Sequence, residues 1–102
     1  MIVTYRDHPI SDFSSVVDSD TQFIDVRQPE ELADGVISGT VNVPLGDLAE
    51  RIPELDRDRR TVVLCRSGGR SEQAAELLDA AGFTDVVNLA GGMQAHDQGG
   101  QA

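Results

Sequence analysis

One loop of this chain brings together the residue types needed to make a thiolate and to hold an anion beside it. Cys65, the only cysteine, is followed by Arg66, by the pair Gly68 and Gly69, and by Arg70. The thiolate is the reactive form of cysteine, and nearby positive charge favours it. Gly68 and Gly69 can adopt positive φ, which lets successive backbone N–H groups point into one concavity that binds anions. These residues predict nucleophilic chemistry by Cys65 on an anionic substrate.

A buried, inert cysteine is the alternative interpretation of Cys65, because free cysteines are commonly buried. A cysteine that only fills space in the core has no need of two arginines and a Gly-Gly pair beside it. We therefore favour a reactive thiol over a packing one.

The elements on either side of the loop predict where Cys65 lies in the fold. Thr61–Leu64 is apolar without alternation, as expected for a strand buried on both faces of a parallel sheet. A helical stripe follows within the segment Glu72–Ala81, and Gly82 then supplies a stop. Cys65 is therefore expected at the carboxyl end of a strand, where open α/β sheets bind ligands.

The run Cys65-Arg66-Ser67-Gly68-Gly69-Arg70-Ser71 resembles the active-site loop of the rhodanese family of sulfurtransferases. Further segments resemble other signatures of that family in the same order along the chain: Phe23–Arg27 with Pro29–Leu32, Gly35–Pro44 and Leu89–Ala95. Two positions depart from the pattern, with Val36 in place of the usual histidine and His96 where tryptophan is frequent. Neither departure lies in the loop of Cys65.

The resemblance implies a two-step transfer of sulfane sulfur through a persulfide on Cys65. The donor would be thiosulfate or a similar small anion, and the acceptor a thiol, cyanide or a protein thiolate. The anion would be bound by the loop residues Arg66, Ser67, Gly68, Gly69, Arg70 and Ser71. The resemblance implies no metal or cofactor. Arg66 resembles the basic residue of thiosulfate-using loops. Arg70 either contacts the donor or braces the loop from behind, and the sequence leaves both roles open.

Two other functions remain as alternatives. Cys-dependent phosphatases and arsenate reductases use a similar loop, but it has one residue more between cysteine and arginine than the four between Cys65 and Arg70. The shorter spacing favours sulfur transfer. A sulfur-carrier or interaction module, loaded by a partner enzyme, is the second alternative, because a shallow site on a small domain suits it equally well.

Composition limits the partners that this chain can have. The net charge of -10 argues against nucleic acid, whose phosphates would be repelled. We expect no signal peptide and no membrane span, and a reducing cytoplasmic setting suits a working thiolate. We expect a monomer. The lysine-free, acidic composition is consistent with solubility or with adaptation to salt.

Strands alternating with helices along the whole chain predict a three-layer α/β/α fold with a mostly parallel sheet of about five strands. Residues 1–97 are expected to form one domain, and residues 98–102 a flexible tail. The first strand is expected at Ile2–Tyr5, and Ser11 could cap the first helix. Pro29 at a first helical position starts another helix.

Asp25 and Arg27 are possible supporting residues of the site. A structural ion pair is the simpler explanation, because buried charges are usually paired. His8 and His96 lack the spacing of metal ligands, so we expect no metal site.

Overall fold

The computed structural model describes residues 4–99, with side chains up to residue 97. Its centre is a parallel sheet of five strands in the order β1-β5-β4-β2-β3. The strands are β1 (Arg6–Pro9), β2 (Gln22–Asp25), β3 (Val41–Asn42), β4 (Thr61–Leu64) and β5 (Val86–Ala90). The expected parallel sheet of about five strands is therefore confirmed.

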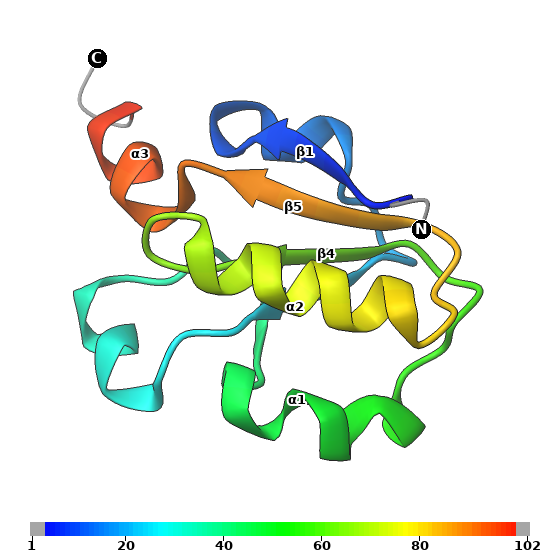
Figure 1. Ribbon diagram of the computed structural model, residues 1–102. Coiled ribbons are helices and arrows are strands. Elements are labelled where there is room, and N and C mark those ends of the chain that lie inside the picture. Colours follow the sequence, from blue (N-terminus) through cyan, green and yellow to red (C-terminus); the bar gives the residue numbers. More distant parts are fainter. Residues whose placement is uncertain (1–3, 100–102) are drawn as a thin grey trace.

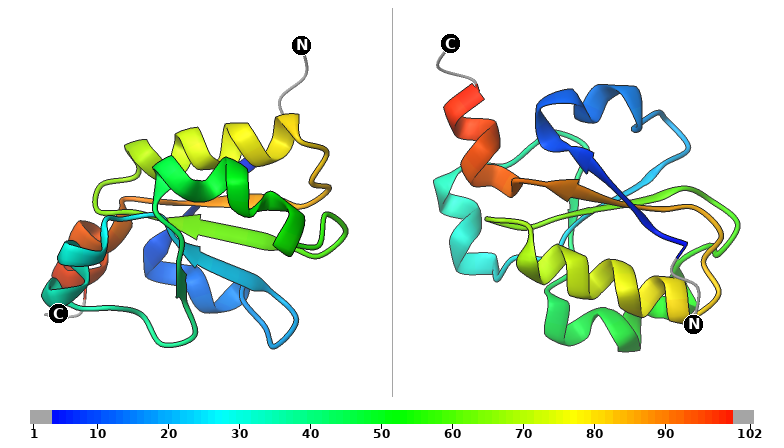
Figure 2. Two further views of the ribbon diagram at one scale, coloured as in Figure 1. Left: turned by 90° about the horizontal axis from the view of Figure 1, so that it is seen from below. Right: turned by 45° about the horizontal axis from the view of Figure 1, so that its top comes forward.

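Within residues 4–99, three α-helices and three 3-10 helices surround this sheet, with helices on both of its faces (Figures 1 and 2). The α-helices are α1 (Leu45–Arg51), α2 (Gly69–Ala80) and α3 (Gly92–Gly99). The 3-10 helices are η1 (Ile10–Ser15), η2 (Pro29–Asp34) and η3 (Ile52–Glu54). Helices α1 and α2 pack together on one face, and α3 contacts η1 on the other. This is the three-layer arrangement that the alternation of elements predicted.

The strand that precedes Cys65 is the most buried of the sheet. All four residues of β4 are buried, since β2 and β5 flank the strand and helices cover both faces. Val63 faces the α2 side with Ala74 and Leu78, and Leu64 faces the other side with Val87 and Leu89. The absence of alternation in Thr61–Leu64 follows directly from this burial on both faces.

The first strand lies later in the chain than the sequence predicted. Strand β1 starts at Arg6, where it pairs with Val87, whereas Thr4 and Tyr5 are outside any strand and residues 1–3 lie outside the described part. Strand β1 is at the edge of the sheet and three of its four residues are exposed, so it carries no apolar pattern.

Of two predicted helix starts, one is corrected and the other is confirmed. No side chain caps η1, whose N-cap is Pro9, so Ser11 does not have the predicted role. Pro29 does begin a helical segment, but that segment is the 3-10 helix η2.

Helix α3 continues to Gly99, so residues 98 and 99 of the predicted tail are helical, and the rest of the tail lies outside the described residues. No helix within residues 4–99 combines the length and apolar character needed to cross a bilayer.

Candidate active site

Cys65 lies directly after β4, at the carboxyl ends of the parallel strands, and a short loop connects it to α2 (Figure 1). This is the position that the sequence predicted. The Cys65 side chain has no exposed surface, because the core on the α2 side of the sheet encloses it. The thiol is thus both the end of a core strand and the start of the loop.

Hydrogen-bond donors from the loop surround the sulfur of Cys65. The backbone N–H of Gly68 donates to Sγ at 3.0 Å, and the Ser71 hydroxyl lies 3.4 Å from the same atom. Burial by itself raises the pKa of the Cys65 thiol. Hydrogen bonds from the Ser71 hydroxyl and from the N–H groups of Ser71, Gly68 and Ser67 outweigh burial, so the pKa is lowered. The loop therefore favours the thiolate.

Only one of the two loop glycines, Gly68, has the positive φ that was expected of both. Gly68 has a φ of 105° and is the N-cap of α2, and this left-handed conformation turns its N–H towards the sulfur. Gly69 is the first residue of α2, and it is not among the residues with positive φ. The prediction of positive φ at Gly69 is wrong, because the helix begins earlier than its apolar stripe.

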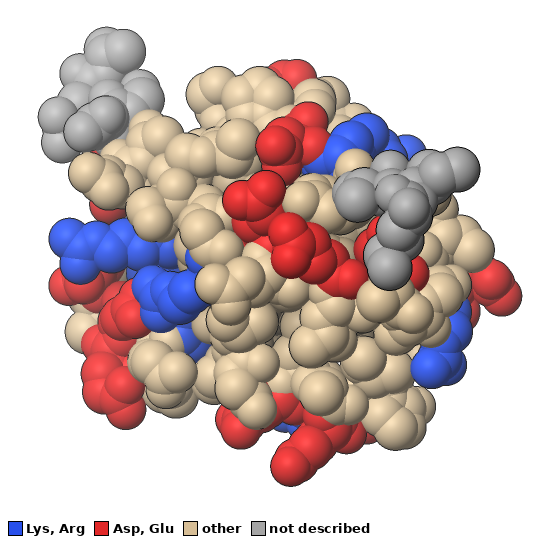
Figure 3. All heavy atoms as spheres, in the orientation of Figure 1, with Lys and Arg blue, Asp and Glu red and all other residues tan. Residues whose placement is uncertain are grey.

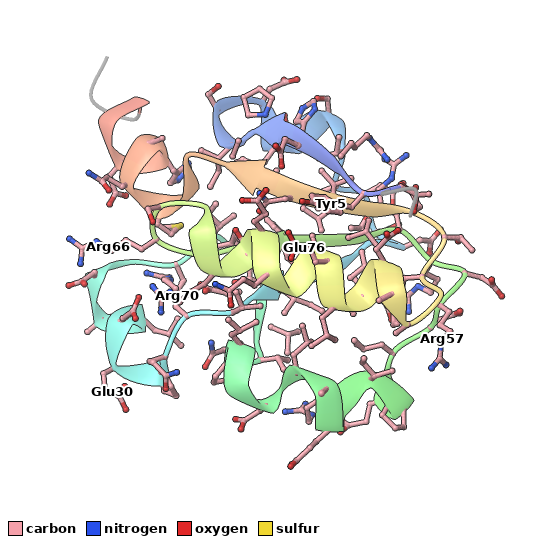
Figure 4. The ribbon with its side chains drawn as sticks, viewed as in Figure 1. Tyr5, Glu30, Arg57, Arg66, Arg70 and Glu76 are labelled. Atoms are coloured by element: carbon pink, nitrogen blue, oxygen red, sulfur yellow. The ribbon has the colours of Figure 1, made fainter. Side chains whose placement is uncertain are left out.

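The two arginines of the loop have different surroundings. Arg70 makes two hydrogen bonds to the carboxylate of Glu31, at 2.7 and 2.8 Å, and so joins α2 to η2. Of its two predicted roles, this contact is the bracing one. Arg66 is exposed, and no carboxylate among the described side chains lies within salt-bridge distance of it. Figure 4 shows Arg66 extending outward from the loop and Arg70 turned towards η2.

Asp25 and Arg27 form a buried ion pair at the end of β2, with 2.7 Å between Arg27 Nη2 and Asp25 Oδ2. Arg27 also donates to the backbone carbonyls of Glu31 and Gly35, which fixes the course of η2. The ion pair therefore positions η2, and Glu31 of η2 in turn binds Arg70. Asp25 and Arg27 thus form the structural ion pair that we expected.

A second support of the loop comes from α3 and was not predicted. The N–H groups of Met93 and Gln94 donate to the carbonyls of Cys65 and Arg66, each at 2.8 Å. Gly92 has a φ of 60°, and a Cβ there would lie 2.5 Å from the Arg66 carbonyl. The backbones approach so closely that only glycine fits. The Gly91-Gly92 pair after β5 was the available signal, since β5 neighbours β4 in the sheet.

A cavity of about 390 Å³ lies beside the loop, between η2 and α3. Its lining residues come from the end of β2, from η2, from the loop and from α3: Arg27, Glu31, Asp34, Arg66, Met93, Gln94 and Asp97. Figure 3 shows basic side chains at this end of the molecule with acidic ones next to them. Cys65 is not in the cavity wall itself, but its neighbours Arg66 and Met93 are.

The two histidines lie apart from the loop. His8 contacts Asp12 at 3.1 Å, and His96 packs edge-on against Phe13. Among the described residues, no group of three or more His, Cys, Asp or Glu side chains is arranged to hold a metal ion. His96 therefore contributes to the packing of α3 on η1.

Known proteins share both the sequence pattern and the fold of this chain. Residues 11–98 match the family described as the rhodanese-like domain. The chain is 44% identical over 78 residues to a putative sulfurtransferase of Bacillus subtilis, covering 76% of this chain and 75% of that protein. It is 38% identical to a thiosulfate sulfurtransferase of Escherichia coli, covering 78% of each. A rhodanese-related protein from Thermoplasma volcanium superposes with a TM-score of 0.83 at 33% identity, covering 94% of both chains.

Proposed function

The chain belongs to the rhodanese-like sulfurtransferase family, and on that premise we propose that it moves sulfane sulfur from a small anionic donor to a thiol through a persulfide on Cys65. The observation that carries this proposal is the set of donors around Sγ, led by the Gly68 N–H at 3.0 Å. Such donors stabilise negative charge on the sulfur without themselves reacting. A single nucleophile that is loaded and then discharged replaces one difficult transfer with two easier ones.

In the first step the Cys65 thiolate attacks the outer sulfur of thiosulfate. A bond forms between Sγ and that sulfur, the sulfur–sulfur bond of thiosulfate breaks, and its electron pair leaves with sulfite. Arg66 supplies positive charge for the donor, since it has no salt bridge to a described carboxylate. The name of the Escherichia coli relative supports thiosulfate as the donor.

The loop stabilises Cys65 as a thiolate both before loading and after discharge. N–H groups that already point at Sγ need no rearrangement to stabilise the attacking thiolate or the thiolate that leaves when the sulfur is passed on. Such preorganisation is the main source of electrostatic catalysis. Because Cys65 has no exposed surface and is not in the cavity wall, neighbouring groups of the loop must move before a donor can reach Sγ.

Cys65 must remain a free thiol for this reaction, and a reducing compartment keeps it so. We accordingly assign the activity to the cytoplasm.

A loading and discharge experiment tests the proposal. The protein is incubated with thiosulfate, the mass of one added sulfur is measured, and cyanide is then added and thiocyanate determined. Wild type should load and turn over, and Cys65→Ser should do neither. Equal thiocyanate production by both would overturn the proposal.

The same experiment separates the alternative functions. Loading only from a partner desulfurase, with none from thiosulfate, would indicate a sulfur carrier instead. Hydrolysis of p-nitrophenyl phosphate that is lost in Cys65→Ser, again without loading, would indicate a phosphatase.

A further inference from the structure

The cavity beside the loop contains charges that the protein does not neutralise. Two of its charged residues are already paired, Arg27 with Asp25 and Glu31 with Arg70. Arg66, Asp34 and Asp97 are exposed, and none of them has a salt bridge to a described residue. One cation and two anions therefore remain to meet whatever enters the cavity.

A small dianion uses only one of these three free charges, Arg66. The two carboxylates outnumber the single guanidinium, so thiosulfate or sulfite is held weakly here and leaves readily. A molecule that carries an ammonium group and a carboxylate, in contrast, can meet the aspartates with one end and Arg66 with the other. Opposite charges placed in this way select one ligand orientation as well as one ligand class.

The size of the cavity limits the ligand further. At about 390 Å³ it falls near the lower end of small-molecule sites, which range over roughly 300–1,000 Å³. An amino acid or short peptide fits this volume. The cavity is lined by Arg66 and Met93, whose backbones adjoin Cys65, so a thiol bound there lies next to the loop.

We infer that the sulfur acceptor of this protein is a zwitterionic amino-acid thiol, bound through its ammonium group to Asp34 and Asp97 and through its carboxylate to Arg66. This inference rests on the proposed function, because it requires a persulfide on Cys65. The acceptor thiolate attacks the outer sulfur of the persulfide and forms a new sulfur–sulfur bond. The bond from that sulfur to Sγ breaks, and its electron pair returns to Cys65 as thiolate, so that atoms and charge balance.

The test measures discharge separately from loading. Protein loaded with thiosulfate and freed of excess donor is mixed with cysteine, cysteamine, N-acetylcysteine or 3-mercaptopropionate in single-turnover experiments. Each rate is divided by the rate of the same thiol with a small disulfide in solution, which removes differences in thiol reactivity. Cysteine should be fastest and cysteamine next. The two thiols without an ammonium group should be slower than cysteine by about tenfold, given two exposed ion pairs of a few-fold each.

Variants then assign the preference to the cavity. Asp34→Asn combined with Asp97→Asn should reduce the advantage of cysteine over N-acetylcysteine to about twofold or less, since both ion pairs are lost. Asp58→Asn makes the same kind of charge change in the turn before β4, at the opposite end of the strands, and should keep the wild-type preference.

Two results would overturn the inference while leaving the proposed function intact. N-acetylcysteine could discharge the loaded protein as fast as cysteine, or only a reduced protein dithiol could discharge it while all four small thiols fail. Failure of the protein to load from thiosulfate would count against the proposed function instead, and it is visible by mass before any acceptor is added.

Discussion

The backbone N–H of Met93 donates to the carbonyl oxygen of Cys65 at 2.8 Å. This bond joins the first turn of α3 to the nucleophile, although the two residues belong to different crossover units of the sheet. The N–H of Gln94 donates in the same way to the carbonyl of Arg66, so two backbone hydrogen bonds attach α3 to the loop. The orientation of the loop therefore depends on α3 as much as on α2.

Gly92→Ala should damage this attachment. The new Cβ would lie 2.5 Å from the Arg66 carbonyl and 2.6 Å from the Cys65 oxygen, and both are backbone atoms that cannot rotate away. We expect a loss of about 1–3 kcal/mol in the free energy of unfolding, as in other overpacked sites, and slower persulfide loading. Gly46→Ala is the control, because a Cβ at Gly46 meets nothing within 4 Å. Equal stability of the two variants in urea would contradict this role of Gly92.

The two loop glycines should respond differently to alanine. Gly68 has a φ of 105°, and a Cβ there would also approach the backbone N of Gly91 at 3.4 Å. We expect Gly68→Ala to slow loading from thiosulfate by about tenfold, since a left-handed alanine costs roughly 1–2 kcal/mol and its relief would turn the N–H from Sγ. Gly69→Ala should be much milder, because its Cβ enters open space. Loading rates by mass spectrometry decide the matter, and similar rates for the two variants would refute the assignment.

The parts of this fold that sequence predicted are those with local signals. The uninterrupted apolar run Thr61–Leu64 identified β4, which is buried on both faces, and the helical stripe within Glu72–Ala81 identified α2, which is buried on one face. The Cys65 loop between them followed from its residue types. Periodicity could not place β1, whose residues at the sheet edge are mostly exposed.

The tertiary contacts that hold the Cys65 loop in place could not be predicted from the sequence, for a different reason. Contact of Glu31 with Arg70 joins two segments that are distant in the chain, and each side chain alone resembles an ordinary surface charge. The approach of Gly92 to Cys65 involves backbone atoms of two distant segments, and the Gly91-Gly92 pair signals a close approach without identifying the segment that it meets. Gly69 was misjudged because the helix starts before its first apolar residue.

Removal of the Ser71 hydroxyl should shift the pH dependence of loading to higher pH. Its hydrogen bond to Sγ lowers the pKa of Cys65, so Ser71→Ala should raise that pKa and leave less thiolate at neutral pH. We expect loading at pH ~7 to be slower by about tenfold, as for loss of a hydrogen bond to a charged group, and to recover as the pH rises. Ser67→Ala is the matched control, because Ser67 acts through its N–H, which alanine retains. Identical pH profiles for both variants would argue against the hydroxyl.

Breaking the buried ion pair should affect stability far more than breaking an exposed one. Asp25→Ala leaves the Arg27 guanidinium buried without its partner, for which we expect a loss of about 3–5 kcal/mol in urea unfolding. Glu54→Ala removes the exposed pair with Arg51, and its cost should be no more than about 1 kcal/mol. Comparable losses in the two variants would mean that Asp25 and Arg27 do not fix η2 as described.

The pair Glu31 and Arg70 should make stability depend on pH in the acid range. Hydrogen bonds from Arg70 lower the pKa of Glu31 in the folded protein. A carboxylate with a lowered folded pKa stabilises the fold above its unfolded pKa, which is ~4.3 for glutamate, and this stabilisation is lost as pH falls through the folded pKa. Glu31→Gln cannot titrate, so wild type should be more stable than the variant near neutral pH, by no more than about 1 kcal/mol, and the two should converge in acid. Glu30→Gln, on the same 3-10 helix but turned away from Arg70 (Figure 4), should show a smaller gap at neutral pH. Urea unfolding across the range measures both gaps, and a gap for Glu31→Gln that stays constant into acid would show that the pair with Arg70 does not stabilise η2.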